Sequence, residues 1–183
     1  MRVVLDACVL FPTVQRQMLT GVAAAGLVQP FWSQRILEEW ARACARLGAG
    51  PELLARGEIV RLQLDWPGAI MAPEPEGDRV LDLPDPDDRH VLGTAIRARA
   101  GLIITQNLRD FPTRALGPHG LRALDPDRFL LDLSAHHAGP VAAVGHSVRR
   151  EAERLSGLLQ GSRALMKRAG MPRFGKWLER EAG

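Results

Sequence analysis

The chain has 183 residues, 46% of them hydrophobic and 25% charged, with two cysteines and a formal net charge of +3. Such a composition is that of an ordinary globular protein of one domain, with at most a small appendage. Cys8 and Cys44 are not in a CxxC pair, which argues against a disulfide scaffold or a zinc module and fits a reducing cytoplasm. No apolar run is long enough for a membrane span, and Asp6 interrupts the first one, so we expect a soluble cytoplasmic protein that starts at Met1.

The charge is unevenly distributed along the chain. Residues 1–139 carry 15 Lys and Arg against 17 Asp and Glu, whereas residues 140–183 carry 9 against 4. A basic C-terminal segment beside a near-neutral body indicates an anionic partner. A pair of solvated amphipathic helices explains the same pattern without a partner, and both explanations stay open at this stage.

Short apolar runs alternate with helical patterns through the first 133 residues. We expect strands at 2–5, 27–32, 68–72, 102–105 and 120–124. Helices are expected between Pro12 and Gly26 and at 34–47, 51–64, 88–99 and 126–133, and further helices follow Pro140. The periodicity places Leu47 and Ile96 on the buried faces of their helices. Strands that alternate with helices predict an α/β fold with a parallel sheet of about five strands.

Polar side chains follow the predicted strands, where parallel sheets bind ligands. Asp6 comes directly after the first strand, Asn107 and Asp110 follow the strand at 102–105, and Glu39 is on the helix after the second strand. The stretch "DLPDPDDRHV" adds four aspartates, the last of which begins the helix at 88–99. Clustered carboxylates suit Mg²⁺ or Mn²⁺, which would balance their charge and support phosphodiester cleavage.

Each of these residues also has an ordinary structural explanation. Asp6 is explained by a turn, Glu39 by a solvated helix face, and Asn107 with Asp110 by an Asx-turn. In the Asp-rich stretch we expect Asp87 to cap the helix and Asp88 to face the site, whereas Asp85 has no clear place. Cys8 has apolar sequence neighbours, which favour a buried and inert thiol.

Four motifs in order give the chain a resemblance to PIN-domain ribonucleases over about residues 1–133. They are "VVLDACVLFP", "WSQRILEEW", "LPDPDDRHVLGTAI" and "LIITQNLRDFP", and the bacterial VapC-type toxins are the most similar subgroup. The resemblance implies a three-layer α/β/α sandwich, with a PIN-like domain at 1–133 and a C-terminal helical extension at 140–183. It also implies an acidic pocket at the C-terminal edge of the sheet.

The site residues implied by the resemblance are carried over by position. Asp6, Glu39 and Asp88 match the first three acidic positions, and Asp6 and Asp88 would bind Mg²⁺ or Mn²⁺ directly. Asn107 stands at the fourth acidic position, which is a departure from the family pattern, and Asp110 is the candidate to replace it. Thr105 would support the pocket, and Asp85 would either support it or face water.

The function implied is a metal-dependent endoribonuclease that acts as the toxin of a toxin–antitoxin pair. Its partners would be RNA and an antitoxin protein, and a homodimer is left open. Backbone phosphates would be bound by the cations Arg89, Arg109, Arg149, Arg150, Lys167 and Lys176. The alternatives are a catalytically degenerate PIN-fold module that binds RNA or protein, favoured by Asn107, and a nuclease acting on DNA.

Overall fold

The computed structural model of the protein describes residues 1–181. The chain folds into two compact units, which are described separately. The sheet unit comprises Met1–Phe11 and Gln29–Leu124, and the helical unit comprises Pro12–Val28 and the described residues of Asp125–Gly183. The division into domains at 1–133 and 140–183 stays a prediction.

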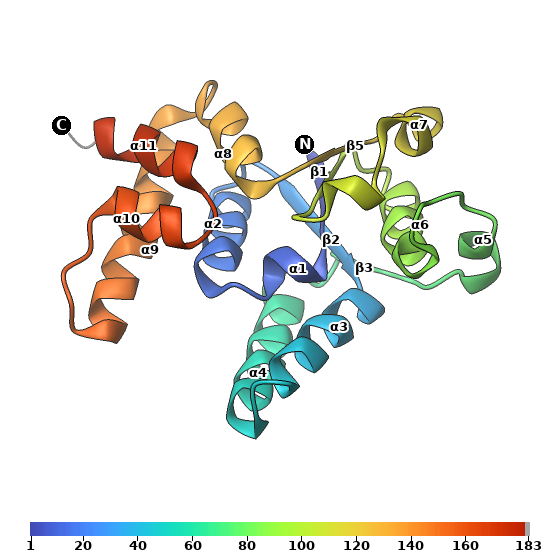
Figure 1. The fold of residues 1–183 in the computed structure, drawn as a ribbon, viewed down its shortest axis with the longest axis horizontal. Helices are drawn as coiled ribbons and strands as arrows, with labels where there is room; N and C mark the ends of the chain where they lie inside the picture. Colours follow the sequence, from blue (N-terminus) through green and yellow to red (C-terminus); the bar gives the residue numbers. More distant parts are fainter. Residues whose placement is uncertain (182–183) are drawn as a thin grey trace. The chain divides into compact units, whose positions relative to one another are not determined.

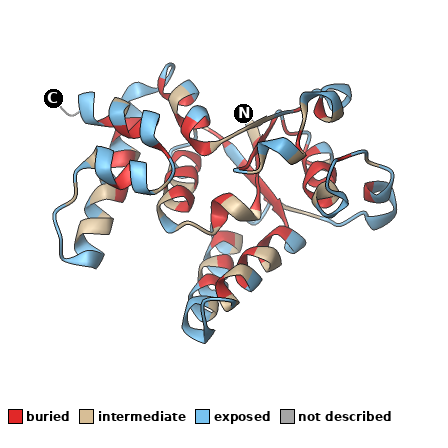
Figure 2. Ribbon diagram, viewed as in Figure 1, coloured by how far each residue is buried: buried red, intermediate tan, exposed pale blue. Residues whose placement is uncertain are grey.

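The sheet unit is built on five parallel strands in the order β3-β2-β1-β4-β5 (Figure 1). The strands are β1 (Arg2–Leu5), β2 (Gln29–Ser33), β3 (Ile70–Met71), β4 (Leu102–Ile104) and β5 (Arg122–Leu124). β1 is central because its "VVL" run is β-branched and apolar, and Val3, Val4 and Leu5 are almost fully buried. Figure 2 shows buried residues along these strands.

Helices and 3-10 turns connect the strands of this unit. They are α1 (Ala7–Leu10), α3 (Gln34–Ala45), α4 (Ala49–Asp65), α5 (Pro75–Arg79), η1 (Pro86–Asp88), α6 (Arg89–Arg97), η2 (Leu108–Asp110), α7 (Thr113–Leu116) and η3 (Gly117–His119). Ser33 begins α3 as expected, because its Oγ accepts a 3.2 Å hydrogen bond from the Ile36 amide. α6 packs against β1, β2 and β4 through its Val91, Leu92 and Ala95 side.

The helical unit contains α2 (Thr13–Ala24), α8 (Pro126–Ser134), α9 (Ala138–Ser156), α10 (Ser162–Arg168) and α11 (Pro172–Arg180). α9 and α11 approach closely because Gly145 leaves room, and a Cβ there would lie 2.6 Å from Leu178 Cδ2. The buried carboxylate of Asp127 on α8 accepts hydrogen bonds from the amides of Arg173 and Phe174 at 3.2 and 2.7 Å. These bonds satisfy the first turn of α11, whose amides have no partner within the helix.

The α/β prediction, with five parallel strands and C-terminal helices, is confirmed. Two buried positions were predicted wrongly: Leu47 is 66% exposed because α3 ends at Ala45, and Ile96 is 36% exposed.

The predicted cap at Asp87 is also wrong. The Asp85 carboxylate accepts a 2.9 Å hydrogen bond from the Asp87 amide and starts η1, so a 3-10 turn precedes α6 and its cap is Asp85. No helix among residues 1–181 is long and apolar enough to cross a membrane.

Candidate active site

Adjacent strands bring Asp6 and Thr105 together at one edge of the sheet. β1 and β4 are paired in register, with Leu5 opposite Ile104, so the two following residues lie side by side. The Asp6 amide continues the ladder with a 3.1 Å bond to the Ile104 carbonyl. Thr105 Oγ1 donates to Asp6 Oδ2 at 2.7 Å, and both residues are buried. A buried carboxylate with a fixed hydroxyl donor has a defined orientation.

Cys8 gives Asp6 a second donor. Its thiol lies 3.1 Å from Asp6 Oδ2 and 3.3 Å from Thr105 Oγ1, and it accepts a 3.2 Å hydrogen bond from the Gln106 amide. Burial, followed by the charge of Asp6, raises the pKa of Cys8 to about 12, so the thiol stays protonated. The prediction of an unreactive thiol fits this pKa. The apolar sequence neighbours predicted a buried thiol, whereas the Cys8 side chain is half-buried and contacts polar groups.

Three aspartates from two segments form the acid cluster, which we define as Asp85, Asp88 and Asp110. Each offers one carboxylate oxygen, and these oxygens lie within 4.8 Å of one another. Asp85 directly precedes η1, and Asp88 is the last residue of that turn, which begins at Pro86. Asp110 is the last residue of η2, which follows β4. Asp85, which the sequence left unplaced, therefore has two roles: it starts η1 with one oxygen and belongs to the acid cluster.

Asn107 stands between two members of the acid cluster. Its Nδ2 donates to Asp88 Oδ2 at 3.4 Å and makes a short contact with Asp110 Oδ2. Its own amide donates to Thr105 Oγ1 at 3.0 Å, which ties the loop to the Asp6 contact. An amide at this position offsets part of the repulsion between the carboxylates that it bridges.

Asp88, one of the clustered carboxylates, has a clearly raised pKa. Its pKa is raised from 3.8 to about 6, first by burial and then by the charges of Asp6, Asp85 and Asp110, while His90 opposes the shift. The negative charge of Asp6 therefore contributes to the raised pKa of Asp88, although Asp6 is not one of the three clustered carboxylates. A group that resists ionisation in this way would be favoured in its charged form by a bound cation.

Glu39 is not one of the clustered carboxylates, and its side chain contacts His90 and Arg35. Its Oε1 lies 3.1 Å from His90 Nε2 and 3.0 Å from Arg35 Nε. Burial alone would raise the pKa of Glu39, but the hydrogen bonds and charges of His90 and Arg35 outweigh it and lower the pKa. Glu39 therefore keeps its negative charge. The sequence analysis did not identify His90 as a site residue. The signal that could have identified it is an ionisable residue on the buried side of the helix that follows Asp88.

The predicted RNA-binding cations are spread over both units. Arg109 is 88% exposed by side chain and lies 3.8 Å from Asp110. Arg89 has a buried Nε without a hydrogen-bond partner among residues 1–181. Arg149 is paired with Glu153 at 2.6 Å, and Arg150, Lys167 and Lys176 are exposed on the helical unit. The roles of all six in RNA binding stay predictions.

The fold and the acidic site together define a class of protein. Comparison with known families matches residues 2–109 to the PIN domain, which is more than half of the chain, and the chain belongs to this family. A curated protein of Mycobacterium tuberculosis (strain ATCC 25618 / H37Rv), named "Putative ribonuclease VapC50", is 58% identical over 45 residues. That match covers 25% of this chain and 27% of the relative, so the chain spans about a quarter of the relative's length. No solved structure matches the chain.

Proposed function

We propose that the protein is a metal-dependent endoribonuclease that cleaves RNA phosphodiester bonds, and that it acts as the toxin of a toxin–antitoxin pair. The observation that carries the proposal is the acid cluster, whose three carboxylate oxygens lie within 4.8 Å of one another in a chain of the PIN domain family. Similarity of one segment to a protein named as a ribonuclease supports RNA as the substrate.

The donor set of the acid cluster fits Mg²⁺ or Mn²⁺. All of its ligand atoms are carboxylate oxygens, which hard divalent cations prefer over nitrogen or sulfur. The raised pKa of Asp88 fits the same conclusion, because burial and the charges of Asp6, Asp85 and Asp110 disfavour its ionised form, which a cation would stabilise. A bound divalent cation would lower the pKa of a coordinated water and offset the charge that develops on the phosphate.

The residues of the site would then have separate roles in metal binding and in RNA cleavage. Asp6 and Asp88 would hold the metal directly, with Asp85 and Asp110 completing its surroundings and Asn107 as a neutral ligand or donor. Glu39, kept ionised beside His90, would orient the attacking water and accept its proton. Thr105 would keep Asp6 in position. The six cations named above would bind RNA phosphates, and an antitoxin would block this site.

The test is RNA cleavage by the purified chain in Mn²⁺, with two neighbouring aspartates compared. Asp88→Asn should abolish cleavage, because it removes a clustered carboxylate. Asp87→Asn is the matched control, since Asp87 is 93% exposed by side chain and is not one of the clustered carboxylates. Equal activity of the parent and both variants, or cleavage that persists in EDTA, would rule the proposal out. Single-stranded RNA and structured DNA assayed in parallel would identify the substrate.

A catalytically degenerate PIN-fold module is the second candidate, and Asn107 is the observation that favours it. An amide replaces a carboxylate there and already donates to Asp88 and Asp110, which weakens the site for a cation. Calorimetric titration with Mn²⁺ separates the two candidates. Absence of binding to the parent chain favours the degenerate module, whereas binding that Asp88→Asn removes favours the nuclease.

A further inference from the structure

An open cavity lies between α1 and α3 in the sheet unit, on the Asp6 side of the candidate site. Its volume is about 520 Å³, and its walls include Cys8 and Glu39. The Cys8 thiol, which lines the cavity, contacts Asp6 Oδ2 at 3.1 Å, so the cavity wall is one contact away from the carboxylate that follows β1. A space of this size is within the range of small-ligand pockets, which is about 300–1,000 Å³.

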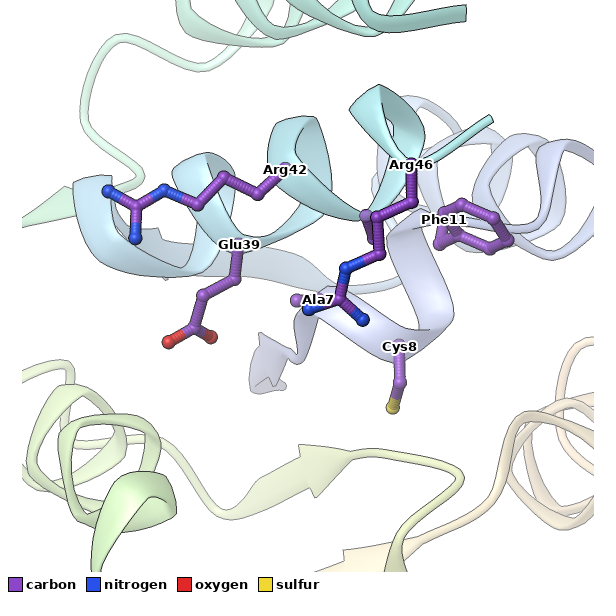
Figure 3. A pocket seen from close by; sticks show the side chains of 7 residues that line it. Ala7, Cys8, Phe11, Glu39, Arg42 and Arg46 are labelled. Carbon is purple, nitrogen blue, oxygen red and sulfur yellow. The ribbon is translucent and has the colours of Figure 1, made fainter. Parts of the chain in front are cut away.

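Arg42 on α3 and Arg46, the residue that follows its last turn, both line the cavity one helical turn apart, and they differ in their partners. Arg42 Nε is held by Glu38 Oε1 at 3.3 Å. The side chain of Arg46 is exposed and makes no hydrogen bond or ion pair with any residue in the described part of the chain. Figure 3 shows Arg46 and Glu39 extending from α3 toward the side on which Cys8 lies, whereas Arg42 extends away. The guanidinium of Arg46 is therefore available to an outside anion.

The remaining cavity residues are apolar. Ala7 and Phe11 come from the α1 segment and Ala43 from α3, and all three are half-buried. Phe11 presents the single aromatic ring in the cavity wall. A cation, an aromatic surface and small flanking side chains are the combination that single-stranded nucleic acids recognise, through the phosphate and the face of the base.

We infer that this cavity holds one unpaired nucleotide of an RNA strand, with its base against Phe11 and its phosphate on Arg46. The inference rests on the proposed function and assigns the substrate nucleotide that lies beside the cleavage site. A base within a duplex cannot reach Phe11, because its faces are covered by its neighbours. The site would therefore select single-stranded RNA. The neighbouring carboxylates would repel a purely anionic ligand and accept hydrogen bonds from a base.

The experiment is fluorescence anisotropy with a labelled single-stranded oligoribonucleotide. All variants carry Asp88→Asn and are measured in EDTA, so that binding is separated from cleavage. Arg46→Ala should weaken binding about tenfold and reduce the dependence of log K on log salt by roughly one. Phe11→Leu keeps most of the side-chain volume but removes the ring, and should also weaken binding about tenfold. Neither variant should change the binding of a duplex of the same sequence.

Two further variants make the result decisive. Arg61→Ala is the matched control, because Arg61 is an exposed arginine of α4 that is paired with Asp65 and does not line the cavity. Ala43→Glu adds negative charge to the cavity wall without removing any packing and should reproduce the loss. Losses confined to Arg46→Ala, Phe11→Leu and Ala43→Glu support the inference. Binding by these variants equal to that of Arg61→Ala overturns it.

The failure of this inference differs from the failure of the proposed function. If the parent chain cleaves RNA in Mn²⁺ but cavity variants bind RNA normally, the nuclease stands and the nucleotide site is wrong. If the parent never cleaves but the cavity variants lose RNA binding, the site stands and the chain is an RNA-binding module.

Discussion

Thr105 Oγ1 donates a 2.7 Å hydrogen bond to Asp6 Oδ2, and this contact joins the carboxyl ends of two neighbouring strands. The same oxygen also accepts a 3.1 Å hydrogen bond from the Cys8 thiol. One face of the Asp6 carboxylate is therefore occupied by the protein itself. The orientation of the remaining oxygen, which a metal or water would meet, depends on these donors.

Thr105→Val should lower RNA cleavage by roughly tenfold. The isosteric change removes the hydrogen bond to the Asp6 carboxylate, worth about 1.5–3 kcal/mol and replaced in part by the Cys8 thiol, and also removes the acceptor of the Asn107 amide. The loss is expected in kcat, because Thr105 positions Asp6 and does not touch the substrate. Thr105→Ser keeps the hydroxyl and should restore most of the rate. A valine variant as active as the serine variant would contradict this positioning role.

In metal-free protein, Asp88→Asn should raise stability at neutral pH. The folded-state pKa of Asp88 is about 6, above its ordinary value of 3.8, so ionisation destabilises the folded state as the pH rises between these values. After allowance for solvent screening of this half-buried group, we expect a gain of about 1 kcal/mol, or about 2–4 °C in Tm. Thermal melts in EDTA should show the gain at neutral pH and its disappearance below about pH 3, where both states are largely protonated.

The exposed neighbour Asp87 provides the control for that measurement. Asp87→Asn removes the same formal charge without removing a clustered carboxylate and should leave Tm nearly unchanged. A stabilisation of equal size in both variants would point to net charge and not to strain at Asp88. With saturating Mn²⁺ the order should reverse, because the metal stabilises the protein that retains the Asp88 carboxylate.

Replacement of His90 should shift the acid limb of the cleavage profile to higher pH. His90 Nε2 lies 3.1 Å from Glu39 Oε1 and helps to lower the pKa of Glu39, which burial alone would raise. His90→Leu removes both the hydrogen bond and the charge, so Glu39 would need a higher pH to ionise. His90→Gln keeps a donor and should shift the profile less. Profiles of kcat against pH that coincide for parent and both variants would exclude Glu39 as the titrating group.

Asn107→Asp should tighten Mn²⁺ binding by about tenfold while it destabilises the metal-free protein. The substitution adds a fourth carboxylate and removes the Nδ2 donor that now bridges Asp88 and Asp110. Calorimetry measures the first effect and melts in EDTA measure the second. Unchanged affinity for Mn²⁺ would mean that this side chain does not face the metal.

Local patterns were enough to predict the strands and their polar ends. The β-branched run before Asp6, the Ser33 cap and the strand before Thr105 each depend on neighbours in sequence, and all are present in the structure. Local patterns did not predict which aspartate caps the turn before α6. Asp85 and Asp87 have similar local sequences, and the choice is made by the 3-10 turn at Pro86.

Long-range partners were beyond the reach of the sequence. Nothing near Glu39 in the chain indicates that His90, 51 positions later, lies 3.1 Å from it. Cys8 shows the same limit, because its sequence neighbours are apolar while its thiol meets Asp6 and Thr105, one of them from another strand end. Side chains that face inward at the edge of a sheet take their surroundings from the other strands.

The contact between Asp127 and the start of α11 has a consequence for shortened versions of the chain. Asp127 is 4% exposed, and its carboxylate is satisfied by two amides and by Arg173 Nε at 2.9 Å. A chain truncated after Gly170 would lose all of these donors and leave a buried charge without partners. Deletion of the last helix therefore cannot serve as a clean test of what that helix does; amide-for-carboxylate exchange at Asp127 should accompany any such truncation.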